Sequence, residues 1–178
     1  LYLFSGITDG HWDGNVKWTD VLNLQTHEWH VLPDTPRARD HAQAVLINDL
    51  IYLAGGRRTH GKSHNVFSDV EPLVDVFSLM TAKWSTLLAP LPRPRAGNAT
   101  FTTNGKLIVA GGESGSSSSA HREVHSYDVA EAKWQVLPPL NQVRHGTGVI
   151  SLAEQFWVAS GSGMQGGAPE LQNVEKVV

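Results

Sequence analysis

Short runs of β-branched and aromatic residues end in a small-glycine doublet four times along the chain. The runs are LYLFSG, IYLAGG, LIVAGG and FWVASG, and they recur at intervals of about 50 residues. A fixed period of this length is typical of stacked or radial repeat architectures, and it constrains the fold more than any other feature. The doublets are Ser5-Gly6, Gly55-Gly56, Gly111-Gly112 and Ser160-Gly161.

Two further markers recur in the same order between the doublets. One is a tryptophan and the other is an arginine followed within a few residues by small or polar residues. The tryptophans are Trp29, Trp84 and Trp134, and the arginines stand in RARDHA, RPRAGNA and VRHGTG as Arg39, Arg95 and Arg144. Three markers in a constant order indicate one structural unit repeated along the whole chain.

The segments between the markers have the character of strands. Runs such as AVLI at 44–47 and KLIVA at 106–110 are separated by turn-forming residues, and Asn104-Gly105 favours a two-residue hairpin. No long stretch has a clean 3.6-residue period, so we predict an all-β fold. The doublets would end buried strands where backbones crowd, and the tryptophans would fill the space between adjacent sheets.

The order of hydrophobic run, Gly-Gly, variable loop, Trp, Leu-Pro and Arg resembles the kelch-repeat family of β-propellers over nearly the whole sequence. The resemblance implies a kelch-type propeller with about three and a half four-stranded blades. We expect one propeller segment, 1–178, with units at 1–36, 37–92, 93–141 and 142–178. Both ends fall inside a unit, which predicts either a longer natural protein or self-association through open propeller edges.

Composition narrows the functional classes. The formal net charge is −3 without a basic patch, and no apolar stretch approaches the roughly 20 residues of a membrane span, so we expect neither nucleic acid nor a membrane as partner. The absence of cysteine excludes disulfides and thiolate metal ligands.

We also expect no metal and no cofactor. On a strand, His121 and His125 would stand about 13 Å apart, too far to share an ion. For His60 and His64, solvated loop side chains are favoured over a zinc site. GSGMQG at 161–166 matches a dinucleotide-binding pattern, but Gly-Ala-Pro follows it where a helix would have to begin, so we interpret it as a loop.

The connections predict where binding occurs. Strands alternate in direction, so the loops after each doublet and the links that carry the repeated arginines emerge on one face, and long loops on a rigid scaffold are where binding usually resides. The predicted long loops are Ile7–Trp18, Arg57–Asp69, Glu113–Glu123 and Ser162–Gln172.

The candidate binding residues on this face are of two kinds. Residues of the links would surround a central opening suited to a carboxylate, namely Arg39, His41, Arg95, Arg144 and His145. Residues outside the repeat pattern are Trp12, Arg58, His60 and His121. As an alternative, the repeated arginines belong to the scaffold and hydrogen-bond to carbonyls of neighbouring blades.

The resemblance implies a noncatalytic module that binds a protein segment or a small acidic ligand through the loop-rich face, with no catalytic residue assigned. The alternative is a carbohydrate-active enzyme similar to the sialic acid mutarotases of this fold. Chemistry like that of the copper-radical sugar oxidases requires a tyrosine crosslinked to a cysteine, so within these residues, which include no cysteine, we do not expect it. A third reading is a scaffold whose work is done by other domains of a longer chain.

Overall fold

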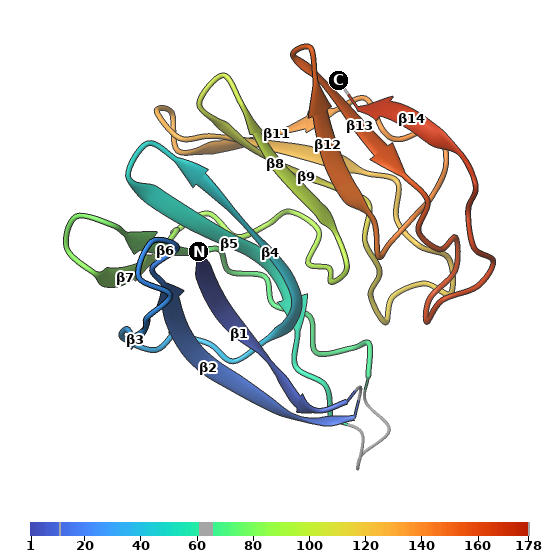
Figure 1. The fold of residues 1–178 in the computed structure, drawn as a ribbon. Coiled ribbons are helices and arrows are strands. Elements are labelled where there is room, and N and C mark those ends of the chain that lie inside the picture. Colours follow the sequence, from blue (N-terminus) through green and yellow to red (C-terminus); the bar gives the residue numbers. More distant parts are fainter. Residues whose placement is uncertain (11, 61–65, 178) are drawn as a thin grey trace.

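Within the part of the chain that the structure describes, the strands form four antiparallel sheets (Figure 1). The computed structural model describes residues 1–10, 12–60 and 66–177. The first sheet contains β1 (Tyr2–Asp9), β2 (Asp13–Leu22) and β3 (Trp29–Val31). The second contains β4 (Asp40–Ile47), β5 (Leu50–Arg57), β6 (Asp75–Ser78) and β7 (Lys83–Thr86). The third contains β8 (Ala99–Thr103), β9 (Lys106–Ala110), β10 (Val124–Asp128) and β11 (Lys133–Leu137), and the fourth β12 (Gly148–Leu152), β13 (Gln155–Ala159) and β14 (Val174–Val177).

The sheets fan out side by side, with β1, β4, β8 and β12 adjacent to one another across the sheet boundaries (Figure 1). Within each sheet, strands consecutive in the chain are paired neighbours. This is the arrangement of propeller blades, and it confirms the predicted all-β propeller fold. Across the described ranges, no helix is long and apolar enough to cross a membrane.

The two ends of the strands are connected differently. Tight turns close one end, as at Asn104-Gly105, where both residues have positive φ (49° and 71°) and Thr103 pairs with Lys106, as predicted. Longer loops follow β5, β9 and β13 at the opposite end. We call this end the loop-rich face.

The prediction of a long loop at Ile7–Trp18 is wrong. A register shift between Phe4 and Gly6 allows β1 to continue beyond the doublet to Asp9, which pairs with Asp13 at the start of β2. Polar side chains do not prevent this extension because the backbone supplies the ladder hydrogen bonds. The result is a long hairpin whose turn carries Trp12.

The glycine doublets and the repeated arginines form one interlocking device. The second glycine of a doublet donates its N–H to the carbonyl of the arginine in the following sheet, as in Gly56 to Arg95 (2.9 Å) and Gly112 to Arg144 (2.8 Å). A Cβ on Gly55 would lie 2.8 Å from the Arg95 carbonyl oxygen, so glycine is required by close approach as well as by its φ of 71°. The predicted crowding at the doublet is therefore confirmed.

The tryptophans join neighbouring sheets. The indole N–H of Trp84 donates to the Pro33 carbonyl of the preceding sheet (2.9 Å), and that of Trp134 donates to the Ala89 carbonyl (3.1 Å). Trp84 also packs edge-on against Phe4 of the first sheet, with ring centroids 5.4 Å apart. Trp84 and Trp134 therefore fill the space between two sheets, as expected, whereas Trp29 of the first sheet is 52% exposed.

Apolar side chains between the sheets form two clusters that complete the scaffold. One cluster joins the second and third sheets and includes Val74, Leu107 and Val109. The other joins the third and fourth sheets and includes Phe101 and Val158. These clusters hold the strand ends, and with them the loop-rich face, in fixed positions.

Candidate functional site

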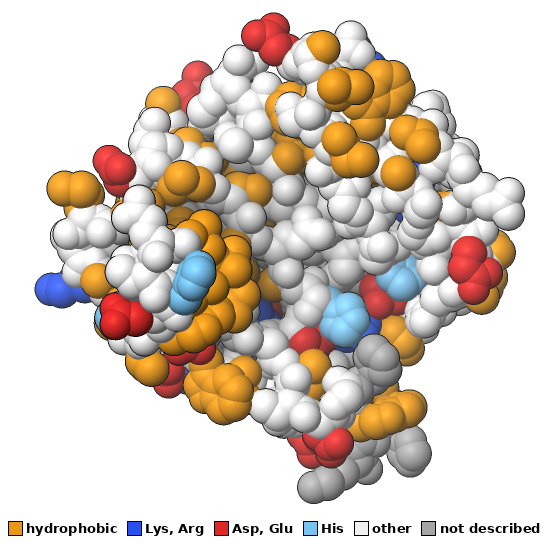
Figure 2. All heavy atoms as spheres, in the orientation of Figure 1, with side chains coloured by type: hydrophobic (Ala, Val, Ile, Leu, Met, Phe, Trp, Pro, Cys, Tyr) orange, Lys and Arg blue, Asp and Glu red, His pale blue; other side chains and the backbone are white. Residues whose placement is uncertain are grey.

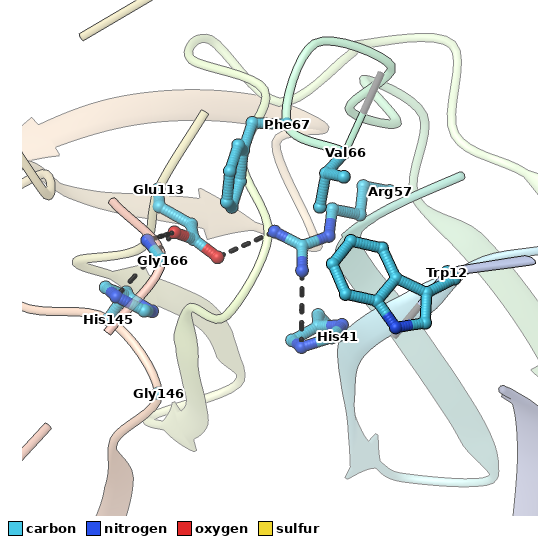
Figure 3. Close-up of a pocket in the computed structure, with 9 residues that line it drawn as sticks. All are labelled: Trp12, His41, Arg57, Val66, Phe67, Glu113, His145, Gly146 and Gly166. Carbon is cyan, nitrogen blue, oxygen red and sulfur yellow. Dashed lines mark hydrogen bonds and ion pairs between the residues drawn. The ribbon is translucent and has the colours of Figure 1, made fainter. Parts of the chain in front are cut away.

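The loop-rich face contains a cavity of about 400 Å³. Figure 2 shows histidine, acidic and basic side chains gathered around a hollow, and Figure 3 shows the cavity in detail. We call this cavity the face pocket. Its lining residues are Trp12, His41, Arg57, Val66, Phe67, Glu113, His145, Gly146 and Gly166.

Arg57 is the cation at the centre of the face pocket. It is the last residue of β5, directly after the Gly55-Gly56 doublet, and only 4% of it is exposed. Its Nη1 group donates to Glu113 Oε1 (2.7 Å), whereas its Nη2 group has only a long contact of 3.5 Å with His41 Nε2 among the interactions of the described residues (Figure 3). One donor group of a buried guanidinium is thus only weakly engaged, which is unusual in a protein interior.

Asp40 fixes the position of His41 by contacting the ring nitrogen Nδ1, while Nε2 faces Arg57. Its carboxylate accepts hydrogen bonds from Asn15 Nδ2 (2.6 Å) and Thr59 Oγ1 (2.8 Å), and it contacts His41 Nδ1. Burial alone would raise the pKa of Asp40, but the hydrogen bonds from His41, Asn15 and Thr59 outweigh burial and lower the pKa below its ordinary value. Asp40 is therefore ionised at neutral pH and orients the imidazole ring towards the pocket.

His41 departs from the repeat. At the equivalent position the next two sheets have Gly97 and Gly146, with φ of 61° and 62°, and His41 adopts the same left-handed conformation with φ of 53°. A side chain in this region is strained, and such strain is concentrated at functional sites. The strained backbone places an imidazole in the pocket where the other two units have no side chain.

Glu113 extends the polar network to the last sheet. Its Oε2 accepts the N–H of Gly166 (2.9 Å) and lies 3.6 Å from His145 Nε2. Together with the contacts of Asn15, Asp40 and Arg57, this makes one polar chain that joins residues from all four repeat units at the pocket.

Aromatic side chains form two walls. Phe67 lies against the guanidinium of Arg57, with 4.9 Å between the Arg57 Cζ atom and the ring centroid. Trp12 lies on the other side, beside His41 and Arg57, and is 63% exposed (Figure 3). A ligand in this cavity would therefore meet flat apolar surfaces as well as polar groups.

The repeated arginines do not face the central opening, which corrects their predicted placement. Arg39, Arg95 and Arg144 are completely buried. Each donates to the carbonyl of the first doublet residue in its own sheet, for example Arg39 Nη1 to Gly55 (3.0 Å) and Arg144 Nη1 to Ser160 (2.7 Å). The carbonyls lie in the same sheet and not, as the alternative supposed, in neighbouring blades.

Besides the doublet carbonyl, each repeated arginine contacts a side chain, and the type of that side chain differs between the sheets. Arg39 and Arg144 each meet a carboxylate, whereas Arg95 donates to the imidazole Nδ1 of His125. Burial lowers the pKa of Arg95 to about 10, and burial followed by the charge of Arg95 lowers the pKa of His125 to about 4. Among the described residues, Arg95 is therefore a buried cation without the carboxylate contact that Arg39 and Arg144 have.

The remaining predicted residues lie in three environments. Trp12, His41 and His145 line the face pocket. Arg58 and His60 are about half exposed and both contact Asp69, outside the pocket. His121 is buried, its Nε2 lies 2.9 Å from Ser114 Oγ, and burial followed by the nearby arginine charges lowers its pKa to about 4.

Sequence reasoning missed Arg57, Glu113, Phe67, Val66 and Gly166 as pocket residues. Arg57 and Glu113 each directly follow a glycine doublet, where the two units carry opposite charges. That contrast between equivalent positions is a signal that the sequence contains. Phe67, Val66 and Gly166 lie within loops of unequal length, for which the repeat gives no alignment. The other histidine considered for a metal site, His64, lies outside the described residues.

Comparisons with known proteins agree with this architecture. The family model described as the KLHDC2/KLHL20/DRC7 Kelch-repeats domain matches residues 1–161. The chain is 32% identical over 158 residues to Kelch-like protein terF of Aspergillus terreus, a match that covers 88% of this chain and 33% of that protein. It is 26% identical over 176 residues to Beta-scruin of Limulus polyphemus, a match that covers 94% of this chain and 18% of that protein.

A solved structure titled "Structure of YjhT" has the same fold. The TM-score is 0.75 at 19% sequence identity, and the match covers 91% of this chain and 49% of that one. The chain thus spans about a third of the length of the terF protein and about half of the YjhT chain.

Proposed function

The chain belongs to the kelch-repeat family of β-propellers, and from that premise we propose that it is a noncatalytic binding module whose face pocket receives an acidic group of a protein segment or small ligand. The observation that carries this proposal is the buried guanidinium of Arg57, whose Nη2 group is directed to the cavity and has, among the described residues, only the long contact to His41. A carboxylate would supply a closer and charged acceptor for this group.

The rest of the pocket supports an acidic ligand with an apolar neighbour. Trp12 and Phe67 provide apolar contact area, and aromatic side chains contribute strongly to recognition because they lose little conformational entropy. A cavity of about 400 Å³ is large enough for a side chain and its flanking backbone.

The test uses a tetrapeptide, acetyl-Gly-Phe-Glu-Gly-amide, which has one carboxylate and one aromatic ring. We expect calorimetry to show binding, and the matched Gln peptide to bind at least about tenfold more weakly because it lacks the charge that Arg57 attracts. Equal affinity for the two peptides, or binding of neither, would contradict the proposal.

Protein variants locate the binding. The double variant R57M/E113Q removes the guanidinium together with the carboxylate to which it donates, so the net charge of the pocket stays the same, and it should abolish the preference for the Glu peptide. R58M is its control, because Arg58 is adjacent in sequence but pairs with Asp69 outside the pocket.

The aromatic wall is tested in the same way. Trp12→Ala should weaken binding about tenfold, whereas Trp18→Ala, which removes a similarly exposed tryptophan of β2, should not.

A second candidate is a carbohydrate-active enzyme that interconverts the anomers of a sugar acid. Asp40 holds the His41 ring with Nε2 towards the cavity, an arrangement in which imidazole acts as a general base. Following the anomers of N-acetylneuraminate by NMR tests this candidate. Exchange no faster than in buffer would remove it, and exchange that is accelerated by this protein but not by the His41→Gly variant would support it.

A further inference from the structure

The proposed acidic ligand would bind beside ionisable groups of the face pocket, here called the pocket floor, whose net charge is already negative. The described ionisable groups at the floor are the carboxylates of Asp40 and Glu113 and the guanidinium of Arg57, which leave one negative charge while the histidines are neutral. A ligand carboxylate would add a second. Uncompensated charge in a partly buried site is costly, so binding needs a further positive charge.

The hydrogen bonds of His41 show how that charge can be supplied. Arg57 Nη2 is a donor, so the His41 Nε2 atom that faces it must be the acceptor, and the ring proton lies on Nδ1, against Asp40. The side chain of His41 is 32% exposed, which allows a ligand and solvent to reach it. In the free protein, the lone pair of Nε2 occupies the place that a ligand carboxylate would take beside Arg57.

We propose that a carboxylate binds in the face pocket together with one proton, which His41 Nε2 takes up from solvent. The carboxylate replaces Nε2 as the acceptor for Arg57 Nη2, and the newly protonated Nε2 donates to the same carboxylate. These two nitrogen atoms are 3.5 Å apart, a separation that the two oxygens of one carboxylate can bridge. This inference rests on the proposed function and specifies its pH dependence.

The other groups around His41 favour this site for the proton. On its own strand Asp40 accepts from Asn15 and Thr59, and these bonds keep it ionised beside Nδ1, where it stabilises an imidazolium. From β5, Arg57 opposes protonation of His41 until a carboxylate separates the two cations. Across the pocket, Glu113 favours a positive charge and His145 donates Nε2–H to the Met164 carbonyl (2.9 Å).

The experiment measures protons directly. Calorimetric titrations with the Glu tetrapeptide in phosphate and in Tris, at pH values from 6 to 8, give the number of protons taken up from the difference in buffer ionisation heat. We expect net proton uptake on binding and an affinity that rises as the pH falls from 8 to 7, by up to tenfold, which is the limit per pH unit for the uptake of one proton.

Two variants assign the proton to its residue. His41→Gly places the residue of the two equivalent positions at a site with positive φ, so it should fold, and it should remove both the proton uptake and the pH dependence. His60→Gln is the matched control, because this half-exposed histidine contacts Asp69 outside the pocket, and it should retain the uptake.

The outcomes separate the two proposals. Preference for the Glu peptide without proton uptake, or uptake that persists in His41→Gly, would overturn the inference and leave the binding function standing. No binding of the Glu peptide at any pH would overturn both.

Discussion

Arg39, Arg95 and Arg144 occupy equivalent positions inside three sheets, whereas Arg57 has no arginine at its equivalent positions and lies in the face pocket. The repeated arginines are completely buried and bond to carbonyls of their own sheets. Arg57 joins the polar chain across the sheets and keeps a weakly engaged donor towards the cavity. The comparison teaches that in this chain the periodic residues build the scaffold and the departures from the period build the site.

The largest effect is expected from breaking a scaffold arginine. Arg144→Met would leave the Glu175 carboxylate buried without its guanidinium, which lies 2.7 Å away, and should lower the free energy of unfolding by about 3–5 kcal/mol. The exposed Arg58→Met should change it by less than about 0.5 kcal/mol. Urea unfolding measures both, and similar losses in the two variants would contradict the distinction between scaffold and surface.

The next effect concerns the tryptophans between sheets. Trp84→Ala should cost about 2–4 kcal/mol, because it removes both the packing against Phe4 and the bond to the Pro33 carbonyl. Trp29, which occupies the same repeat position in the first sheet, is 52% exposed, so Trp29→Ala should cost less than about 1 kcal/mol. Thermal unfolding measures the loss of stability in both variants. A larger loss for Trp29→Ala than for Trp84→Ala would contradict the placement of Trp84 between two sheets.

A smaller effect should appear in the pH dependence of stability. The folded-state pKa of His121 and of His125 is about 4, below the ordinary 6.5. Both rings stay neutral in the folded chain and take up protons on unfolding between pH 6.5 and 4. Stability should therefore be fully present above pH 6.5 and fall as the pH decreases through that window, by up to about 1.4 kcal/mol per pH unit for each histidine.

His125→Glu sharpens this prediction. It gives Arg95 the kind of partner that Asp75 gives Arg39, so it should raise the free energy of unfolding at pH 7 by about 1–2 kcal/mol and flatten the pH profile. Urea unfolding at pH 7 and pH 5 provides the check. A destabilised variant whose pH profile is unchanged would show that the imidazole suits Arg95 better than a carboxylate.

The smallest effect on stability is expected at the pocket. His41→Gly relieves a left-handed backbone at about 1 kcal/mol but loses the contact with Asp40, so the free energy of unfolding should change by less than about 1 kcal/mol. A loss above about 2 kcal/mol in urea unfolding would mean that His41 belongs to the scaffold.

The sequence predicted the scaffold well because each periodic marker has one physical task. At Gly56 a Cβ would clash with neighbouring atoms, Trp84 fills the space between two sheets, and the buried Arg39 donates hydrogen bonds to backbone carbonyls. The same residue types therefore recur at these positions. Prediction failed where two units differ without a visible reason, as in the long β1–β2 hairpin, whose extension depends on a backbone register shift.

The sequence predicted only some of the residues of the face pocket, because the pocket is built largely from residues that depart from the repeat. His41 and His145 were found because they stand beside the repeated arginines, and Trp12 because it lies outside the repeat. Arg57, at the end of β5, and Glu113 meet only in three dimensions because they are 56 residues apart, and no local spacing in the sequence indicates an ion pair of that kind.

Mapping of bound ligand by NMR tests the central claim most directly. With the backbone amides assigned, titration with the Glu tetrapeptide should shift the amides of Trp12, His41, Arg57 and Gly166 and leave those of Arg39, Arg95 and Arg144 with at most small changes. Shifts confined to the tight-turn end, around Asn48 and Asn104, or centred on the repeated arginines, would contradict the assignment of binding to the departures from the repeat.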